Sequence, residues 1–175
     1  MIRKVAAEET YALRQQVLRP HQQLTEVGFP GEDDPDTVHF AAFRDGGRIV
    51  GIATALHQDP GDAIAGADPS TWWRLRGMAV AEDHRHLGIG AGLLGRVVDH
   101  VASHGATALW CNARLPAAGF YRAVGFVASG DTWEEPGIGP HVKMWRPIPL
   151  PSPGPAPSRT DIPASPLCTP PASAC

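Results

Sequence analysis

The segment Arg85-His86-Leu87-Gly88-Ile89-Gly90 joins a predicted strand to a long predicted helix, and the expected fold follows from it. Its glycines allow the main chain to approach a bulky ligand closely. The first N–H groups of the following helix lack carbonyl partners, and the helix dipole adds partial positive charge at that end. The segment is therefore suited to bind a phosphate or pyrophosphate, to which Arg85 can add a charge-assisted hydrogen bond.

The elements on both sides of this loop have clear periodicity. Before it, Trp72–Val80 is strand-like, with large side chains alternating with Arg74 and Arg76. Gly105 is placed to cap the C-terminus of the helix that follows the loop. That helix carries apolar residues on one face at helical spacing, namely Leu93, Leu94, Val97, Val98 and Val101.

Strands and helices continue to alternate along the rest of the chain, and Asp45-Gly46-Gly47 is a hairpin signal. Further strands are predicted at Ile2–Val5, Thr37–Arg44, Arg48–His57, Ala106–Asn112, Phe126–Trp133 and His141–Arg146, and further helices at Glu8–Arg19 and Ala117–Val124. The order β-α-β-β-β-α-β-α-β-β predicts one α/β domain over residues 1–146, with helices packed on a single mixed sheet.

The composition changes sharply after this domain. Residues 147–175 contain ten prolines among Ser, Ala and Thr. Such a segment lacks the apolar side chains whose burial would offset the entropy of ordering, so we expect a disordered tail. A proline-rich ligand for a partner domain is the alternative.

The bulk properties exclude several classes of protein. A net charge of -3 and an isoelectric point near 6.2 give no electrostatic basis for nucleic acid or an anionic membrane as a partner. The first residues lack a signal peptide's apolar core, and no stretch has the ~20 apolar residues of a membrane span. The three cysteines form neither a disulfide framework nor a metal-ligand pattern. We expect a cytoplasmic protein without a metal.

Two motifs resemble the GNAT superfamily of N-acetyltransferases. The first is Met78-Ala79-Val80 followed by Arg85-x-x-Gly88-x-Gly90 and Gly92-Leu93-Leu94, which is similar to the family's acetyl-CoA signature. The second, Phe120-Tyr121-Arg122-Ala123-Val124-Gly125-Phe126, is similar to its helix-to-strand element. Their order and spacing are typical of the family. The resemblance implies a mostly antiparallel sheet and acetyl-CoA as co-substrate.

The resemblance also implies roles for particular residues. In the family, two central strands separate beside the cofactor, and a strand N–H polarises the thioester carbonyl. Tyr121 occupies the position of the general acid that protonates the leaving thiolate, although a tyrosine there can also simply fill space beside Phe120. The implied cofactor-binding residues are Met78, Ala79, Val80, Arg85, His86, Leu87, Gly88, Ile89, Gly90 and Ala91.

The acceptor amine must lose a proton before it attacks, and four residues are candidates for the base. Glu135 and His141 rank ahead of Glu82 and Glu134, because a Gly-Ile…Pro-His stretch resembles the last-strand connection in a branch of small bacterial GNAT proteins. Each is otherwise an exposed charge or a hydrogen-bonded histidine, and an ordered water chain can replace a direct base. The acceptor is a small-molecule or peptide amine, and homodimers are common among similar proteins.

Other functions remain open at this level. A non-catalytic acyl-CoA-binding sensor would share the same loop. The letters of Gly90-Ala91-Gly92-Leu93-Leu94-Gly95 satisfy a dinucleotide fingerprint, but nine residues separate them from the preceding strand, and no acid follows ~20 positions on. At Arg114 many GNAT proteins carry Asn, and the nearby Asn112 therefore takes no assigned role.

A few remaining residues have alternative interpretations. Arg14 and Arg19 are either a site for an acidic substrate or a solvated helix face. His100 and His104 have metal-ligand spacing without a third ligand, which favours a helix surface. Cys111 is expected to be a buried strand residue. Three tryptophans are expected to anchor the core or a sheet face, namely Trp72, Trp73 and Trp110.

Overall fold

The computed structural model describes residues 1–44, 46–61 and 68–149. No helix among these residues is long and apolar enough to cross a membrane. The strands are β1 (Ile2–Val5), β2 (Val38–Arg44), β3 (Arg48–His57), β4 (Trp72–Val80), β5 (Ala108–Arg114), β6 (Val127–Glu135) and β7 (Gly139–Pro147). The α-helices are α1 (Tyr11–Leu18), α2 (Ile89–Ser103) and α3 (Ala118–Ala123).

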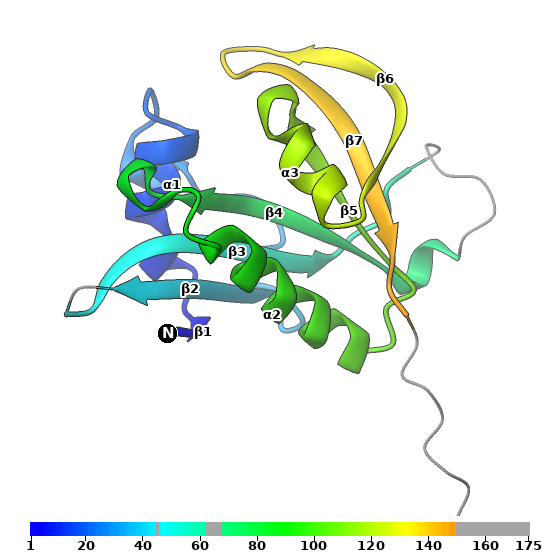
Figure 1. Ribbon diagram of the computed structural model, residues 1–175, viewed down its shortest axis with the longest axis horizontal. Coiled ribbons are helices and arrows are strands. Elements are labelled where there is room, and N and C mark those ends of the chain that lie inside the picture. The colour runs from blue at the N-terminus through cyan, green and yellow to red at the C-terminus, as the bar shows by residue number, and fades with distance from the viewer. Residues whose placement is uncertain (45, 62–67, 150–175) are drawn as a thin grey trace, which may run out of the picture.

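The strands form one sheet in the order β1-β2-β3-β4-β5-β7-β6 (Figure 1). Every neighbouring pair is antiparallel except β4 and β5, which are parallel. The parallel pair requires a crossover, and α2 supplies it. The predicted single mixed, mostly antiparallel sheet with flanking helices is confirmed.

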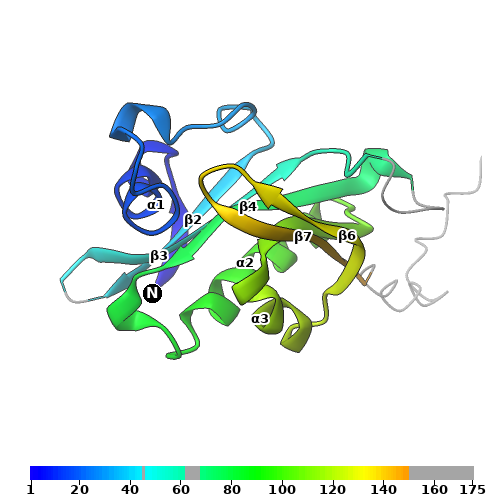
Figure 2. The same ribbon diagram turned by 90° about the horizontal axis from the view of Figure 1, so that it is seen from above.

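Helices cover both faces of the sheet. Figure 2 shows α1 on one face and α2 with α3 on the other. The apolar face of α2 is buried, and Gly51 in β3 lets it come close, because a Cβ at this glycine would lie 2.9 Å from Ile89 Cγ2 and Leu93 Cδ1. Burying each such large aliphatic side chain contributes roughly 1.5–3 kcal/mol. This packing fixes α2, and with it the loop that begins the helix, against the sheet.

Two irregularities open the middle of the sheet. In the β3–β4 ladder, Ile52 pairs with Ala79 and Thr54 with Arg76, so two residues of β4 oppose one of β3. This is a β-bulge, and Gly77 within it has φ +60°. The parallel pairing of β4 with β5 ends at Arg74 opposite Trp110. Beyond that point each strand pairs only with its other neighbour, and a gap separates them.

Some boundaries differ from the sequence-based prediction. The first helix begins as a 3-10 turn over Glu8–Thr10, and α1 ends at Leu18. The strand predicted at Ala106–Asn112 begins at Ala108 instead. Gly105 with φ +75° caps α2 as predicted, and the Ala106 N–H donates to Val101 O at 3.0 Å. Ala106 therefore still belongs to the helix cap.

The C-terminal end of the described chain packs against the domain. β7 runs to Pro147, one residue past the predicted domain end, and the Ile148 N–H donates to Thr107 O at 2.9 Å. Ile148 is also buried in the main core. The remainder of the predicted tail, from residue 150, lies outside the described residues.

Candidate active site

The loop between β4 and α2 has the backbone geometry of an anion-binding turn. His86 and Gly88 both have positive φ, at 62° and 75°, and Gly88 is the N-cap of α2. Gly92 is the first residue whose N–H donates back to the loop, to Gly88 O at 2.9 Å. The N–H groups of residues 89–91 have no carbonyl of a preceding helical turn to bond, so they and the dipole of α2 are available to an anion.

This loop borders a cavity of about 700 Å³ on the face covered by α2 and α3, here called the α2-side cavity. Most of the residues expected to bind a cofactor surround it, but Leu87 does not line it and is 61% exposed. The absence of a side chain at Gly90 leaves space in this cavity, since a Cβ on this residue would lie only 3.4 Å from Phe120 Cζ. The lining residues are Met78, Ala79, Val80, His84, Arg85, His86, Gly88, Ile89, Gly90, Ala91, Pro116, Ala117, Phe120, Tyr121 and Val124.

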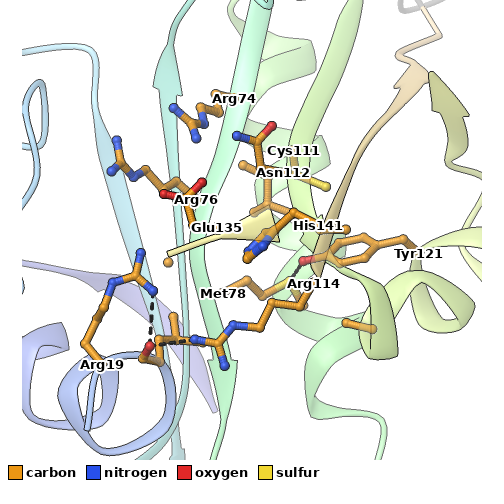
Figure 3. Close-up of a pocket in the computed structure, with 15 residues that line it drawn as sticks. Arg19, Arg74, Arg76, Met78, Cys111, Asn112, Arg114, Tyr121, Glu135 and His141 are labelled. Carbon is orange, nitrogen blue, oxygen red and sulfur yellow. Dashed lines mark hydrogen bonds between the residues drawn. The ribbon is translucent and has the colours of Figure 1, made fainter. Parts of the chain in front are cut away.

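A second cavity, of about 290 Å³, lies beside the C-terminal end of α1 and is here called the α1-side cavity. It is lined by charged and polar side chains from β4, β5 and the β6–β7 hairpin (Figure 3). The lining residues are Leu18, Arg19, Arg74, Leu75, Arg76, Gly77, Met78, Cys111, Asn112, Ala113, Arg114, Ala117, Tyr121, Glu135 and His141.

The two cavities meet at Met78, Ala117 and Tyr121, which line both. The Tyr121 O–H points to Met78 and donates to its Sδ at 3.8 Å (Figure 3). Tyr121 is only 8% exposed, and burial raises the pKa of its phenol above the ordinary value. Met78 lies past the point where the pairing of β4 with β5 ends, so the two cavities adjoin beside the gap in the sheet.

Comparison with known proteins identifies the family. The acetyltransferase (GNAT) family matches residues 4–126. The chain belongs to the GNAT family. It is 31% identical over 147 residues to an uncharacterized N-acetyltransferase of Bacillus subtilis (strain 168), YitI, covering 84% of this chain and 95% of the relative. The predicted family membership and N-acetyltransferase class are thereby confirmed.

Solved structures of GNAT proteins share the fold. A putative N-acetyltransferase from Lactobacillus plantarum superposes with a TM-score of 0.66 at 19% identity, covering 85% of this chain and 97% of that one. An aminoglycoside 6'-N-acetyltransferase complexed with coenzyme A has a TM-score of 0.65 at 17% identity, with coverage of 87% and 99%. At these identities the likeness concerns the fold.

The four candidate bases of this GNAT protein fall into two groups, according to whether they line a cavity. Glu135 and His141 line the α1-side cavity, whereas Glu82 and Glu134 are exposed and line neither cavity. Neighbouring strand residues face opposite sides of a sheet, which explains why Glu135 but not Glu134 reaches the cavity. Trp133 Nε1 donates to Glu135 Oε2 at 3.2 Å, and the Trp133 ring stacks on His141 at 5.7 Å.

The tautomer of His141 follows from the one hydrogen bond that its ring makes to the described residues. Its Nδ1 lies 2.8 Å from Gly139 O, and a carbonyl oxygen can only accept, so Nδ1 carries the proton. In the neutral imidazole, Nε2 then has a free lone pair. His141 is buried at the cavity wall, so this lone pair is held in a fixed orientation.

The prediction for Arg14 was wrong in both of its versions, because the side chain is neither solvated nor free for a substrate. Arg14 is 2% exposed, and its Nη1 lies 2.7 Å from Glu32 Oε2. Burial alone would raise the pKa of Glu32, but hydrogen bonds from Tyr11 and Arg14 outweigh it, and the pKa lies below its ordinary value. Arg14 also donates to Val27 O, and the ion pair thus ties α1 to the loop after it.

The histidine pair on α2 is partly packed rather than a plain helix surface. The rings of His100 and His104 lie 4.2 Å apart, and both make edge contacts with Trp73. Burial lowers the pKa of His100 to about 4. The described residues contain no group of three or more His, Cys, Asp or Glu side chains that could hold a metal ion.

Cys111 and the tryptophans lie where the sequence predicted. Cys111 is buried in β5, and Trp73 belongs to the main core. Trp72 and Trp110 form a smaller cluster together with Trp145.

The sequence prediction missed three cavity residues: Arg74, Arg76 and Arg114. The alternation of arginines along residues 72–80 indicated a wetter sheet face, but nothing local indicated what that face borders. Arg114 was noted only because many GNAT proteins have Asn there. Its Nη2 donates to Leu18 O at 2.5 Å, across 96 residues of sequence, and both residues line the cavity.

Proposed function

We propose that this GNAT protein transfers an acetyl group from acetyl-CoA directly to a primary amine, with donor and acceptor bound at the same time. The observation that supports it is the junction of the two cavities at Met78, Ala117 and Tyr121. A donor in the α2-side cavity and an amine in the α1-side cavity would meet in the gap of the sheet. Holding both reactants there provides the proximity that accelerates a two-substrate reaction.

The α2-side cavity fits the parts of a coenzyme A thioester. Acetyl-CoA supplies the acetyl group in activated form. The backbone N–H groups at the start of α2 suit the pyrophosphate. The edge of β4 from Leu75 to Val80 is not paired with β5, so Met78, Ala79 and Val80 can bind the extended pantetheine arm as an added strand does. The bulge at Gly77 leaves a main-chain N–H near the gap to stabilise developing negative charge on the carbonyl oxygen.

Tyr121 serves as a hydrogen-bond donor to the departing sulfur. Burial raises the pKa of its phenol, whereas a thiol has an ordinary pKa near ~8.5. Complete transfer of the proton from this phenol to a thiolate would therefore be uphill. The O–H instead stabilises the leaving group while keeping its proton, which places its contribution at the low end of the ~10²–10⁴-fold range for acid catalysis.

His141 takes the proton of the acceptor ammonium. The hydrogen bond to Gly139 fixes the protonated Nδ1 and leaves Nε2 as a proton acceptor. Glu135 lines the same cavity and supplies a negative charge that attracts the ammonium. The proposal thus gives the two candidate residues different roles, whereas the sequence alone ranked them together.

Cys111 also lines the α1-side cavity, but its state favours direct transfer over a cysteine-bound intermediate. Burial raises the pKa of this thiol to about 12. A nucleophilic cysteine needs a substantial thiolate population near neutral pH. Cys111 remains protonated there and serves as a packing residue.

Thermal melting followed by thiol release across a panel of amines tests this function. Acetyl-CoA at 100 times its Kd should add about 2.7 kcal/mol of stability. Thiol release should then follow, and double-reciprocal plots should intersect, because parallel lines indicate a ping-pong mechanism. Stabilisation without thiol release on any amine would favour a non-catalytic acyl-CoA sensor instead.

A further inference from the structure

Four arginines surround the α1-side cavity. Arg74 and Arg76 come from β4, Arg19 follows the last residue of α1, and Arg114 ends β5. Figure 3 shows their guanidinium groups around the same hollow as Glu135 and His141. Glu135 is the one acidic residue among the lining side chains, so positive charge exceeds negative charge at this wall.

No carboxylate within the described residues forms an ion pair with any of the four. Arg19 and Arg114 both donate to Leu18 O, and Arg74 donates to Gln58 Oε1 at 3.0 Å. The buried Nε of Arg74 has no hydrogen-bond partner in the described part of the chain. These guanidinium groups keep donors that protein groups do not use.

Within the described residues, Arg76 differs from the other three arginines in the kind of contact its guanidinium makes. Its guanidinium lies over the Phe29 ring at 4.2 Å and makes no hydrogen bond to a described residue. Burial, together with the charges of Arg74, Arg19 and Arg14, lowers its pKa to about 10. At neutral pH the group is still charged, so like charges are crowded in a half-buried site. Crowding of this kind is relieved when an anion binds.

We propose that the acceptor is an amine that also carries a carboxylate or a phosphate, and that Arg76, Arg74 and Arg19 bind this anion. The inference rests on the proposed function, because it places the amine of the same molecule toward Tyr121 and His141. A planar guanidinium matches both anions through paired hydrogen bonds. Polycationic amines, such as polyamines and aminoglycosides, are disfavoured because the same arginines repel them.

Matched acceptor pairs test the proposal with the full chain and acetyl-CoA. Each pair shares an amine and differs in the anion: β-alanine with β-alaninamide, aspartate with asparagine amide, and phosphoethanolamine with ethanolamine. Thiol release gives kcat/KM for each compound. We expect the member that carries the anion to exceed the member that lacks it by at least about tenfold in kcat/KM in at least one pair, as for one charge-assisted hydrogen bond. The carboxylate and phosphate pairs distinguish the two anions.

A test variant and a control variant show whether the cavity arginines cause the preference for an anionic acceptor. Arg76→Gln should raise KM for the preferred anionic acceptor by about tenfold or more while kcat changes much less. Arg96→Gln, at an exposed position of α2 that lines neither cavity, should leave both unchanged. If Arg76→Gln does not fold, Arg19→Gln serves instead. Rates with the anionic acceptor should also fall as salt rises, because the attraction is screened.

Several results would overturn the proposal. One is equal or faster turnover of the member without the carboxylate or phosphate in every pair, and another is best turnover with spermidine or kanamycin. An unchanged KM for the anionic acceptor in Arg76→Gln, or in Arg19→Gln where that variant replaces it, would also overturn the proposal. Failure of the proposed function is distinct from these, since acetyl-CoA would then bind and no amine of any charge would release thiol.

Discussion

The two cavities of this protein are constructed in different ways. The α2-side cavity is bordered mainly by one short run of chain, from Met78 to Ala91, and uses backbone N–H groups, a helix dipole and glycines. The α1-side cavity gathers side chains from α1, β4, β5, β6 and β7, and its character comes from charged groups. Local main-chain geometry thus forms the proposed donor site, whereas long-range packing forms the proposed acceptor site.

Different interactions also stabilise the two cavities. The loop after α1, which begins at the α1-side cavity residue Arg19, is held by the buried Arg14–Glu32 pair, which also engages Tyr11 and Thr10. The donor site depends on how closely α2 packs on β3 instead. Substitutions at one site should therefore leave the other largely intact, and the following predictions test that independence.

The largest expected effect is on stability, from Arg14→Met. Removing one partner of a buried ion pair leaves Glu32 uncompensated, and the free energy of unfolding should fall by about 3–5 kcal/mol in urea denaturation. Arg3→Met is the control, since Arg3 and Glu9 form an exposed pair at 3.4 Å, and it should cost about 0–1 kcal/mol. Equal losses in the two variants would show that the buried pair does not hold the acceptor side. Below its melting temperature, Arg14→Met should still bind coenzyme A normally.

His141→Gln should lower kcat by about 10²-fold or more at neutral pH. The deficit should shrink as pH rises, because more of the amine then loses its proton to solvent. Steady-state thiol release from pH 6 to pH 10 measures this. His57→Gln, at an exposed position outside both cavities, is the matched control and should behave as wild type. A deficit that is constant with pH would show that His141 only positions other groups.

Tyr121→Phe should lower kcat by about 10²-fold, because the variant loses the donor to the leaving sulfur. Its Kd for acetyl-CoA, from calorimetry, should change by less than about threefold. Tyr11→Phe removes the same hydroxyl from the other tyrosine, which lines neither cavity, and should keep most of the turnover. Full activity in Tyr121→Phe would exclude the residue from the reaction.

The smallest effect concerns the donor site alone. Gly90→Val would place a side chain between Phe120 and Met78, where a Cβ already lies 3.4 and 3.5 Å from their nearest atoms. We expect Kd for coenzyme A to rise by about tenfold, because the added methyl groups fill the cavity. Gly95→Ala on the same helix meets nothing within 4 Å, so it should keep Kd and add about 0.5–1 kcal/mol of stability. Unchanged binding in Gly90→Val would place the cofactor elsewhere.

The same contrast explains how much of the protein the sequence could predict. The element order and the donor loop follow from periodicity, glycines and a family motif, all of which are local. Arg14 looked like a surface residue because its partner Glu32 lies 18 positions away in a loop without periodicity. Arg76 and Arg114 come together only through the gap between parallel strands. No local pattern of residues encodes where strand pairing stops.

A crystal structure of the protein with coenzyme A tests the central claim most directly, namely that the donor reaches the acceptor cavity through the gap between β4 and β5. We predict the pyrophosphate on the N–H groups of residues 86–91, and the sulfur within about 3–4 Å of the Tyr121 hydroxyl, beside Met78. A thiol that lies on the outer surface of α2, away from Tyr121 and Met78, would contradict this account.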